Sequence, residues 1–300
     1  MSTKVSIVVN PTAGRGQGAK KLESVVAAFG GIGNVDLLAT GDRAEEHALT
    51  RAALARGATV IVALGGDGTC ANIAQAILHA RSNCALAVVA AGTGNDFAKT
   101  LGVIEYKPTH IAALVKRESP QRIDVGIADG HFFLNSCGFG FDPSVLEASN
   151  RVRFLKGDAV YIYSALRQLF SYPGVDVATN GVAGVKRGRM LMITVSNGRF
   201  LGGAFKIAPR ASVLDGRLDT CFFSDANVVQ RVRLFAGALR GTHLGMPQVT
   251  SASVQQLTLT FPNPPQMEMD GELRTARSKT VELKCIPRAL SVIAAPGALL

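Results

Sequence analysis

Two glycine-rich turns carry the side chains best suited to chemistry in this chain of 300 residues. One reads GGDGT (residues 65–69) and the other GTGND (residues 92–96), and each follows an apolar run typical of a buried strand. Glycine lets the backbone approach a phosphate closely, and a helix that begins after such a turn directs its N–H groups to the same place. With NPTAGRG (residues 10–16) after an earlier strand, the two turns favour a nucleotide site over two tight turns with helix caps.

The residues of these turns, and their carboxylates in particular, restrict which kinds of nucleotide site are possible. The sequence contains no GxxxxGK[ST] motif, and GTGNDF lacks the last glycine of GxGxxG, so neither a P-loop nor a dinucleotide fingerprint is present. Asp67 and Asp96 would repel a bare triphosphate. They fit the site if Mg²⁺ or a proton lies between the carboxylates and the phosphates, or if the carboxylates hold ribose hydroxyls or backbone N–H groups. The pattern is typical of metal-assisted phosphoryl transfer without proving it.

The elements that position these turns alternate along the first part of the chain. Strands are predicted at residues 4–10, 34–40, 59–65 and 84–92, and helices at about 19–29, 43–57, 70–80 and 110–117. Strands that alternate with helices form βαβ units and a parallel sheet, which binds ligands at the carboxyl ends of its strands. Both glycine turns follow such ends.

The pattern changes near Arg122, where short strands separated by Asp-Gly and Gly turns begin. Helical patterns intervene only at about residues 155–171 and 227–240. We therefore predict an α/β plus β fold, with an α/β nucleotide-binding domain at 1–126 and a β-sandwich domain at 127–286. The C-terminal segment 287–300 is expected to return to the first domain.

Composition limits the classes of partner. The net charge of +10, from 32 Lys and Arg against 22 Asp and Glu, favours an anionic partner. The absence of tryptophan and of any nucleic-acid-binding motif argues against nucleic acid. Five scattered cysteines fit neither a disulfide framework nor a zinc site and favour the cytoplasm. No segment approaches the roughly 20 apolar residues of a membrane span, so any membrane contact would be peripheral.

In their order, NP…G (residues 10–14), GGDGT and GTGNDFA resemble the catalytic domain of the diacylglycerol kinase family. That family includes soluble bacterial lipid kinases and the sphingosine and ceramide kinases. The resemblance extends over essentially the whole chain through RIDVG (122–126), FLNSCGFGFD (133–142), VSNGRFLGG (195–203), DGRLD (215–219) and MDGE (269–272). GGDGT alone is shared with NAD kinases, whereas the later motifs favour lipid kinases.

The resemblance implies a Rossmann-like domain, a lipid-contacting β-sandwich and an active site in the interdomain cleft. It makes Asp270 the general base that acts on the lipid hydroxyl, with Glu272 positioning or polarising it. An Asp-Gly hairpin turn would expose the carboxylate of Asp270. The implied ATP-binding residues are Asn10, Thr12, Gly65, Gly66, Asp67, Gly68, Thr69, Gly92, Thr93, Gly94 and Asn95.

The resemblance also implies two magnesium sites. Asp67, Asp96 and Asp124 would hold the catalytic Mg²⁺, directly or through water. A second, structural Mg²⁺ would lie at the turn that contains Asp215, with Ser212 and Arg217 as further partners. A plain Asp-Gly turn explains that second sequence equally well.

The expected function is that of an ATP-dependent lipid kinase that acts peripherally on the cytoplasmic membrane, with diacylglycerol as the leading acceptor and phosphatidic acid as the product. The alternatives are an NAD kinase-like nucleotide kinase and a non-catalytic lipid- or nucleotide-binding protein. Two basic clusters could face the bilayer, one between Arg151 and Arg189 and the other formed by Arg231, Arg233 and Arg240. The sequence does not show which of them does, and the second is taken as the working choice. The sequence identifies neither the lipid nor the oligomeric state, and a homodimer remains open.

Overall fold

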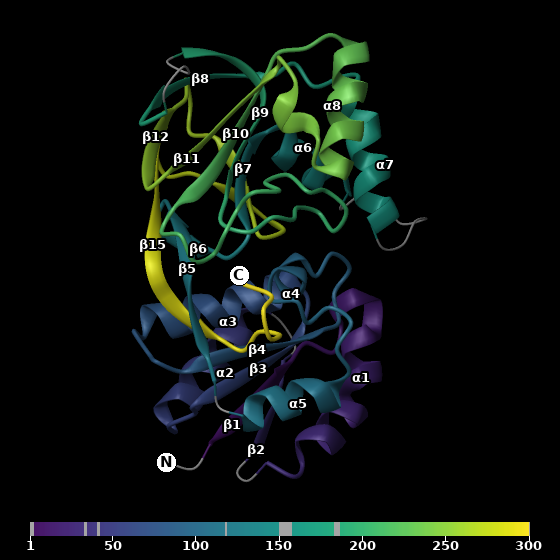
Figure 1. The fold of residues 1–300 in the computed structure, drawn as a ribbon, viewed down its shortest axis with the longest axis vertical. Coiled ribbons are helices and arrows are strands. Elements are labelled where there is room, and N and C mark those ends of the chain that lie inside the picture. Colours follow the sequence, from purple (N-terminus) through teal and green to yellow (C-terminus); the bar gives the residue numbers. More distant parts are fainter. Residues whose placement is uncertain are drawn as a thin grey trace. The chain divides into compact units, whose positions relative to one another are not determined.

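The computed structural model describes residues 3–32, 35–40, 43–117, 119–149, 158–182 and 187–299 (Figure 1). The chain forms two compact units. Unit 1 comprises Met1–Asp124 and Arg288–Leu300, and unit 2 comprises Val125–Pro287. Strands β5 (Gln121–Ala128) and β15 (Thr280–Val292) contribute residues to both units.

Unit 1 contains a parallel sheet in the order β2-β1-β3-β4. Its strands are β1 (Val5–Val9), β2 (Val35–Ala39), β3 (Val60–Gly65) and β4 (Ala85–Ala90). Strands β1, β3 and β4 are buried along their whole length, as their continuous apolar runs predict. The end of β15 extends this sheet, because Ser291 and Val292 pair in parallel with Ala85 and Leu86.

The helices of unit 1 are α1 (Ala13–Phe29), α2 (Arg43–Ala55), α3 (Asp67–His79), α4 (Asp96–Thr100) and α5 (Pro108–Lys116). The chain runs from β1 outward to β2 and then back across β1 to β3. Since βαβ crossovers are right-handed, this reversal places α1 and α2 on opposite faces of the sheet. Gly14, Arg15 and Gly16 have positive φ at the start of α1, so its regular helix begins near the predicted position.

Unit 2 is built on antiparallel strands in the order β14-β13-β7-β9-β8-β12-β15. Strand β9 also pairs with β10, which pairs with β11, and β5 pairs with β6. The strands of unit 2 other than β5 and β15 are β6 (His131–Phe133), β7 (Ser136–Gly140), β8 (Val175–Asn180), β9 (Arg187–Ser196), β10 (Leu218–Ser224), β11 (Val249–Val254), β12 (Gln256–Thr260), β13 (Gln266–Met269) and β14 (Glu272–Thr275).

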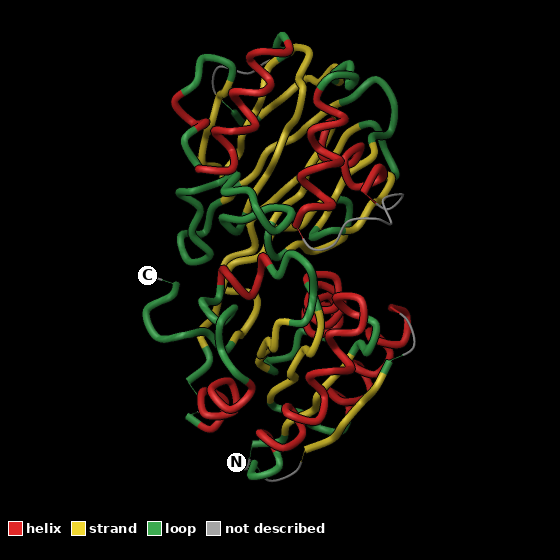
Figure 2. The backbone as a smooth tube through the Cα atoms, turned by 90° about the vertical axis from the view of Figure 1, so that its right-hand side faces the viewer, coloured by secondary structure: helices red, strands yellow, loops and turns green. Residues whose placement is uncertain are grey.

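The strands of unit 2 separate two hydrophobic clusters. On β10, Leu218 and Phe222 belong to a cluster formed mainly by strands, whereas Cys221 and Phe223 belong to a cluster that includes helices. This alternation follows from the two-residue period of a strand. The helices are α6 (Phe141–Ser149), α7 (Asp158–Leu169) and α8 (Val228–Arg240), and a 3₁₀ turn covers His243–Gly245. They lie on one face of the strands (Figures 1 and 2).

The predicted fold class, an α/β domain followed by a β-sandwich-like domain, is confirmed. Helix α8 begins one residue later than predicted because Asn227 forms a capping box with Gln230. The helix predicted at 155–171 corresponds to α7, although residues 155–157 lie outside the described part of the chain. Among the described residues, no helix has the length and apolar character needed to cross a membrane.

Candidate active site

The three loops that follow β1, β3 and β4 touch one another through glycine backbones. A Cβ atom on Gly92 would lie 2.4 Å from the Cα of Gly66, and one on Gly14 would lie 2.1 Å from the carbonyl oxygen of Ala91. No side chain fits at these distances. The glycines therefore pack the loops against each other at the carboxyl ends of the strands, where a parallel sheet binds its ligand.

Glu46 on α2 links the first two loops. This side chain has no exposed surface. Its Oε1 accepts hydrogen bonds from Asn10 Nδ2 and Thr69 Oγ1, both at 2.9 Å, and its Oε2 accepts one from Asn72 Nδ2 at 2.8 Å. Asn10 Oδ1 in turn accepts the backbone N–H of Thr12 at 3.1 Å and its hydroxyl at 2.8 Å. The predicted nucleotide residues Asn10, Thr12 and Thr69 thus depend on one buried carboxylate.

Sequence reasoning did not identify Glu46. The sequence feature that could have identified it is its place on the helix. Glu46, Thr50 and Ala53 have the i, i+4, i+7 spacing of one helix face, and in the structure all three are buried. A carboxylate on the buried face of a helix requires partners. The sequence alone does not show that those partners come from the glycine loops.

Asp67 links the second loop to the third. Its Oδ1 accepts the N–H of Phe97 at 2.9 Å, in the first turn of α4. Within the third loop, Asn95 has a left-handed backbone, and its side chain closes the turn through two 2.8 Å hydrogen bonds with the backbone of Gly92. A carboxylate in this turn therefore holds a backbone N–H group, which is one of the roles that the sequence left open.

The other predicted nucleotide residues lie on the same loops. Gly65 is buried, Gly68 and Gly94 are half-buried, and Thr93 is exposed. Helix α3 begins directly after Gly66, so its N-terminus adds N–H groups to this surface. Lys21 contributes a cation nearby, since its Nζ donates to the carbonyl oxygen of Ala90 at 2.6 Å. The arrangement can bind an anionic group such as a phosphate.

Each of the three predicted ligands of the catalytic Mg²⁺ has a protein partner. Asp67 accepts the N–H of Phe97, Asp96 forms a 3.0 Å ion pair with Lys99, and the buried Asp124 accepts the N–H of Arg288 at 2.8 Å. Over the described part of the chain, no three Asp, Glu, His or Cys side chains form a group that could hold a metal ion. The described residues thus form no complete metal cage, and the assignment of these ligands stays a prediction.

In unit 2, the carboxylate of Asp270 is buried, and the expectation that its turn exposes it is wrong. The side chain is 5% exposed. Its Oδ2 accepts the N–H of Leu134 at 2.6 Å. Its Oδ1 accepts the N–H groups of Asn135 at 2.8 Å and Ser136 at 3.2 Å. The reason is that β13 pairs with β7, which brings the turn after β13 onto the segment that precedes β7.

Three motifs that lie far apart in the sequence meet at this turn. Asp270 from MDGE accepts backbone N–H groups of residues 134–136 in FLNS, and Asn197 from VSNG donates to backbone carbonyl groups of the same segment. Asn197 Nδ2 donates to the carbonyl oxygen of Leu134 at 2.8 Å, and the N–H of Asn197 donates to that of Asn135 at 2.8 Å. These motifs therefore build one compact support for a carboxylate.

Burial raises the pKa of Asp270 to about 6, against the opposing effect of its three N–H hydrogen bonds. The negative charge of Glu272 raises this pKa further. Glu272 itself pairs with Arg274 at 2.9 Å. A carboxylate with this pKa is largely ionised at neutral pH and can still accept a proton, which is the property that a general base needs.

Two further acids, which the sequence did not identify, support the turn. Glu268 is 2% exposed and accepts the N–H of Gly271, the residue after Asp270. Burial, followed by the nearby charge of Asp142, holds the pKa of Glu268 well above its ordinary value. Asp142 is 1% exposed and lies close enough to Glu268 for its charge to raise that pKa. Two buried carboxylates this close to each other disfavour the charged form of both.

The Asp-Gly turn at residues 215–216 has a second carboxylate beside it. Asp215 Oδ1 accepts the N–H of Arg217 at 3.0 Å, and Ser212 Oγ accepts that of Leu214 at 3.3 Å. Burial and the neighbouring Asp215 raise the pKa of Asp219 to about 6. Asp219 was not among the residues predicted from the sequence. Magnesium at this turn stays a prediction.

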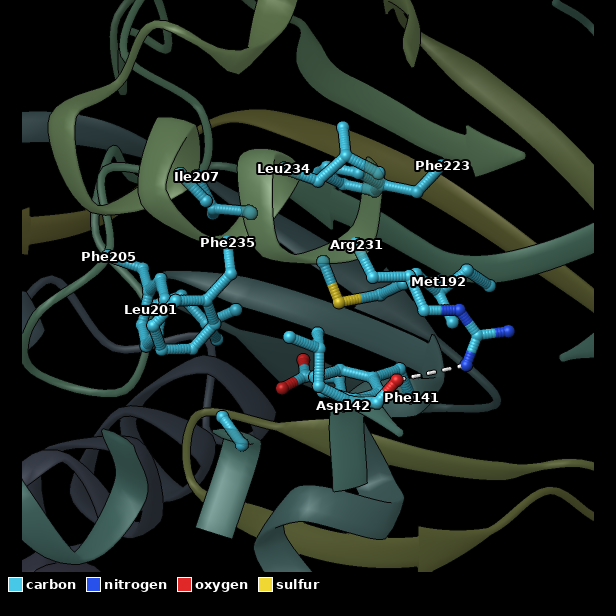
Figure 3. A pocket seen from close by; sticks show the side chains of 14 residues that line it. Phe141, Asp142, Met192, Leu201, Phe205, Ile207, Phe223, Arg231, Leu234 and Phe235 are labelled. Atoms are coloured by element: carbon cyan, nitrogen blue, oxygen red, sulfur yellow. Dashed lines mark hydrogen bonds between the residues drawn. The ribbon is translucent and has the colours of Figure 1, made fainter. Parts of the chain in front are cut away.

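Unit 2 also holds an apolar cavity of about 50 Å³ between its strands and helices (Figure 3). Its walls come from β9, β10, α6, α7 and α8. Asp142 and Arg231 are its charged lining residues. Asp142 therefore lines the cavity and also lies near Glu268, which accepts the N–H of Gly271 beside Asp270.

Arg231 does not face outward as predicted, since its side chain is only 11% exposed. Its Nη1 donates to the carbonyl oxygens of Leu169 at 3.1 Å and Tyr172 at 2.8 Å. Its Nη2 pairs with Asp225 at 3.2 Å. Because the carbonyl groups at the end of α7 lack helical partners, the guanidinium satisfies them and ties the start of α8 to the end of α7.

Comparison with known proteins matches the two parts of the chain to two domain families. Residues 4–128 match the diacylglycerol kinase catalytic domain, and residues 135–294 match the YegS C-terminal NAD kinase beta sandwich-like domain. A nucleotide-binding α/β domain followed by this β-sandwich-like domain defines an ATP-dependent kinase. The chain belongs to the diacylglycerol kinase family, which includes the YegS-like lipid kinases.

Individual relatives cover most of the chain. It is 28% identical to the "Diacylglycerol kinase" of Bacillus subtilis (strain 168) over 90% of this chain and 89% of that protein. It is 32% identical to a "Probable lipid kinase YegS-like" of Pseudomonas putida over 77% of this chain and 79% of that protein. It is 27% identical to a "Diacylglycerol kinase" of Mycobacterium tuberculosis over 97% and 94%.

Solved structures share the fold. The crystal structure of a diacylglycerol kinase from Bacillus anthracis str. Sterne has a TM-score of 0.73 at 20% identity, over 99% of this chain and 98% of that chain. Another structure from the same strain reaches a TM-score of 0.81 at 22% identity, over 98% and 97%. At these identities the likeness supports the architecture alone.

The contact between Gly66 and Gly92 leads to a specific expectation. Neither Gly92 nor Gly66 has a φ in the left-handed region, so the close approach of the loops is what opposes a side chain. We expect Gly92→Ala to force the loops apart, to lower the free energy of unfolding by about 1–3 kcal/mol and to weaken ATP binding. Thermal unfolding and a nucleotide titration measure both effects.

Gly31→Ala is the matched control, because a Cβ atom there would meet only the flexible end of Lys116 at 3.4 Å. If Gly92→Ala retains the stability and ATP affinity of the control, the loops do not depend on this contact.

Proposed function

We propose that this kinase transfers the γ-phosphate of ATP to the hydroxyl group of a membrane lipid, with diacylglycerol as the leading acceptor and phosphatidic acid as the product. Relatives named diacylglycerol kinase and lipid kinase support a lipid acceptor. In this reaction the acceptor oxygen forms a bond to the γ-phosphorus, the bond to the ADP oxygen breaks, and the hydroxyl proton leaves. The protein acts at the cytoplasmic face of the membrane, as a step of phospholipid biosynthesis.

The phosphates of ATP are proposed to bind the loops after β1, β3 and β4. The N–H groups at the start of α3 and the backbone of the GGDGT turn would contact them, and Lys21 adds a positive charge nearby. The hydrogen bonds of Glu46 and Asp67 keep these loops in place before the nucleotide arrives. Such preorganisation reduces the cost of ordering the site on binding.

Asp270 is proposed to take the proton from the lipid hydroxyl. The observation that carries this role is its burial together with a pKa of about 6. Its ionised form dominates at neutral pH, and its hydrogen bonds to residues 134–136 fix its orientation. Glu268 and Asp142 would act on the reaction only through the position of the turn.

Magnesium is proposed to reach the site with the nucleotide. In kinases Mg²⁺ usually binds phosphate oxygens and water together with one or two carboxylates, which fits the absence of a complete metal cage among the described residues. Asp67, Asp96 and Asp124 remain the proposed carboxylates, directly or through water. When bound, Mg²⁺ would neutralise charge on the phosphates.

The apolar cavity of unit 2 favours a lipid over NAD as the acceptor. Apart from Asp142 and Arg231, its lining side chains are apolar. We propose that it holds acyl-chain carbon atoms. Asp142 lines the cavity and lies near Glu268, which accepts the N–H of Gly271, so the cavity reaches the acids that support the turn of the proposed base.

The test is phosphate transfer from radiolabelled ATP to long-chain and short-chain diacylglycerol, monoacylglycerol, phosphatidylglycerol, ceramide, sphingoid bases and NAD. We expect transfer to a lipid and none to NAD. Ala238→Phe, which adds volume to the cavity wall, should raise the KM for the long-chain lipid while the short-chain acceptor is affected far less.

Ala236→Phe on the same helix is the matched control, because Ala236 is more exposed and does not line the cavity. Transfer to NAD alone would reject the lipid proposal. An equal effect of Ala238→Phe and Ala236→Phe on the long-chain KM would reject the role of the cavity.

A further inference from the structure

Exposed apolar side chains concentrate at helices α7 and α8. Among the described residues, six of the ten exposed large apolar side chains lie there: Tyr163, Leu166, Phe170, Val228, Val229 and Val232. Phe170 and Val229 are the most exposed, at 62% and 61%. Isolated apolar side chains on a surface need no explanation, whereas a group of them marks an interaction site.

These six side chains belong to one surface. The hydrogen bonds of Arg231 to the carbonyl groups of Leu169 and Tyr172 hold the start of α8 against the end of α7. Both helices lie on the same face of the unit 2 strands (Figures 1 and 2). Each also lines the apolar cavity with its other side, through residues such as Leu169 and Leu234 (Figure 3). Their exposed stripes therefore both point away from the core.

The same surface is positively charged. Arg167 follows Leu166, and Arg233 follows Val232, and both arginines are exposed. Arg189, also exposed, donates to the carbonyl oxygen of Pro173, just beyond the end of α7. The acidic residue nearest to the start of α8, Asp225, is paired with Arg231. From residue 226 to residue 267 the sequence contains no Asp or Glu.

We propose that this α7–α8 face, formed by the six apolar side chains with Arg167, Arg189 and Arg233, adsorbs to an anionic lipid bilayer. Apolar side chains beside arginines on one helical surface suit the boundary between lipid headgroups and acyl chains. A second copy of the chain fits less well, because a symmetric contact would place arginines against arginines. The cavity behind the same two helices would then lie next to the membrane that supplies its acyl chain.

This inference rests on the proposed lipid acceptor, and the experiment separates the two. The full chain is sedimented with phosphatidylglycerol–phosphatidylcholine vesicles that contain no diacylglycerol, in the absence of ATP. We expect binding to exceed that on pure phosphatidylcholine at least tenfold and to fall with added salt. Each surface arginine should contribute about fivefold.

Two pairs of substitutions test the face itself. Phe170→Ser with Val229→Ser should reduce vesicle binding at least tenfold, whereas Val26→Ser with Leu37→Ser, at exposed apolar sites in unit 1 (44% and 46%), should not. Arg167→Gln with Arg233→Gln should remove most of the salt dependence, whereas Lys20→Gln with Lys116→Gln, both exposed in unit 1, should not.

The outcomes are distinct. If the face variants bind vesicles as tightly as the unmodified chain, or if the unit 1 controls lose binding equally, the assignment of this face is wrong. If Phe170→Ser with Val229→Ser converts a dimer to a monomer without changing vesicle binding, the face is a contact between copies instead. Loss of vesicle binding with retained phosphorylation of short-chain diacylglycerol supports the face and leaves the proposed function intact. Vesicle binding by a chain that phosphorylates no lipid supports the face and rejects the function.

Discussion

The Asp270→Asn variant is expected to lose phosphate transfer by about 10²–10⁴-fold, the usual contribution of a general base. Asparagine occupies nearly the same volume but cannot accept a proton from the acceptor hydroxyl. The KM for ATP should change little, because Asp270 is not part of the loops proposed to bind the phosphates. Initial rates with saturating ATP and a lipid acceptor give the comparison.

The same variant should also be less stable. Asp270 accepts three backbone N–H groups with two oxygens, whereas asparagine offers one oxygen and directs an NH₂ group toward N–H donors. Leaving buried donors without acceptors costs about 1–3 kcal/mol. Thermal unfolding must therefore accompany the rates, and the assay temperature must lie well below the Tm of the variant.

Asp129→Asn is the matched control for this effect. Asp129 also has a φ of 50° in a turn between strands, and it accepts the N–H of Arg277 at 3.1 Å. It has no place in the proposed chemistry. If Asp270→Asn loses no more activity than Asp129→Asn, then Asp270 supports the turn without acting as the base.

The pH profile tests the same assignment independently. Because burial raises the pKa of Asp270 to about 6, its proton-accepting form is lost as the pH falls through that value. The kcat/KM of the unmodified kinase should fall below about pH 6. Glu272→Gln removes a charge that raises this pKa, so the acidic limb should move to lower pH. If the acidic limb does not move in this variant, the pH profile is determined by a group other than Asp270.

The fold follows from features that are local in the sequence. The buried strands β3 and β4 are continuous apolar runs that end in glycine turns, and α8 begins at a capping residue, Asn227. Hydrophobic period, turn residues and caps act over a few neighbouring residues, so the sequence alone predicts them. The alternation of strands and helices then determines the parallel sheet and the end at which its loops gather.

The chemistry of the site depends on contacts that are distant in the sequence. Asp270 was expected to be exposed because an Asp-Gly turn usually is, yet its partners lie at least 134 residues away in the chain. Arg231 was assigned to the surface by composition, whereas the end of α7 holds it in the interior. Sequence patterns predict which residue types take part, but burial and hydrogen-bond partners arise only when separate strands pair.

Replacement of Glu46 is expected to have the largest effect on stability. Its carboxylate accepts three side-chain hydrogen bonds without any contact with solvent. Glu46→Ala would leave Asn10, Thr69 and Asn72 without this acceptor and create a cavity between α2 and α3. Each donor left without an acceptor costs about 1–3 kcal/mol and the cavity adds to this, so the total is a large fraction of the stability of a domain. Thermal unfolding of the purified variant measures this loss.

Glu46→Gln separates the loss of hydrogen bonds from the cavity. Glutamine can keep one oxygen for Asn10 and Thr69, but its NH₂ group then faces the donor of Asn72. We expect a loss of about 1–3 kcal/mol and a rise in the Kd for ATP, since Asn10 and Thr69 belong to the nucleotide loops. The neighbouring Glu45, exposed on the same helix, provides the control, and Glu45→Gln should change the stability by less than about 0.5 kcal/mol.

The two measurements on Glu46→Gln have different meanings. A lower Tm with an unchanged Kd for ATP would show that Glu46 supports the core and that the loops keep their shape without it. A raised Kd at a temperature where the variant is fully folded would show that the nucleotide loops depend on this hydrogen-bond network. Normal values of both would contradict the prediction, because a buried carboxylate with three donors cannot be neutralised without effect if those hydrogen bonds stabilise the folded state.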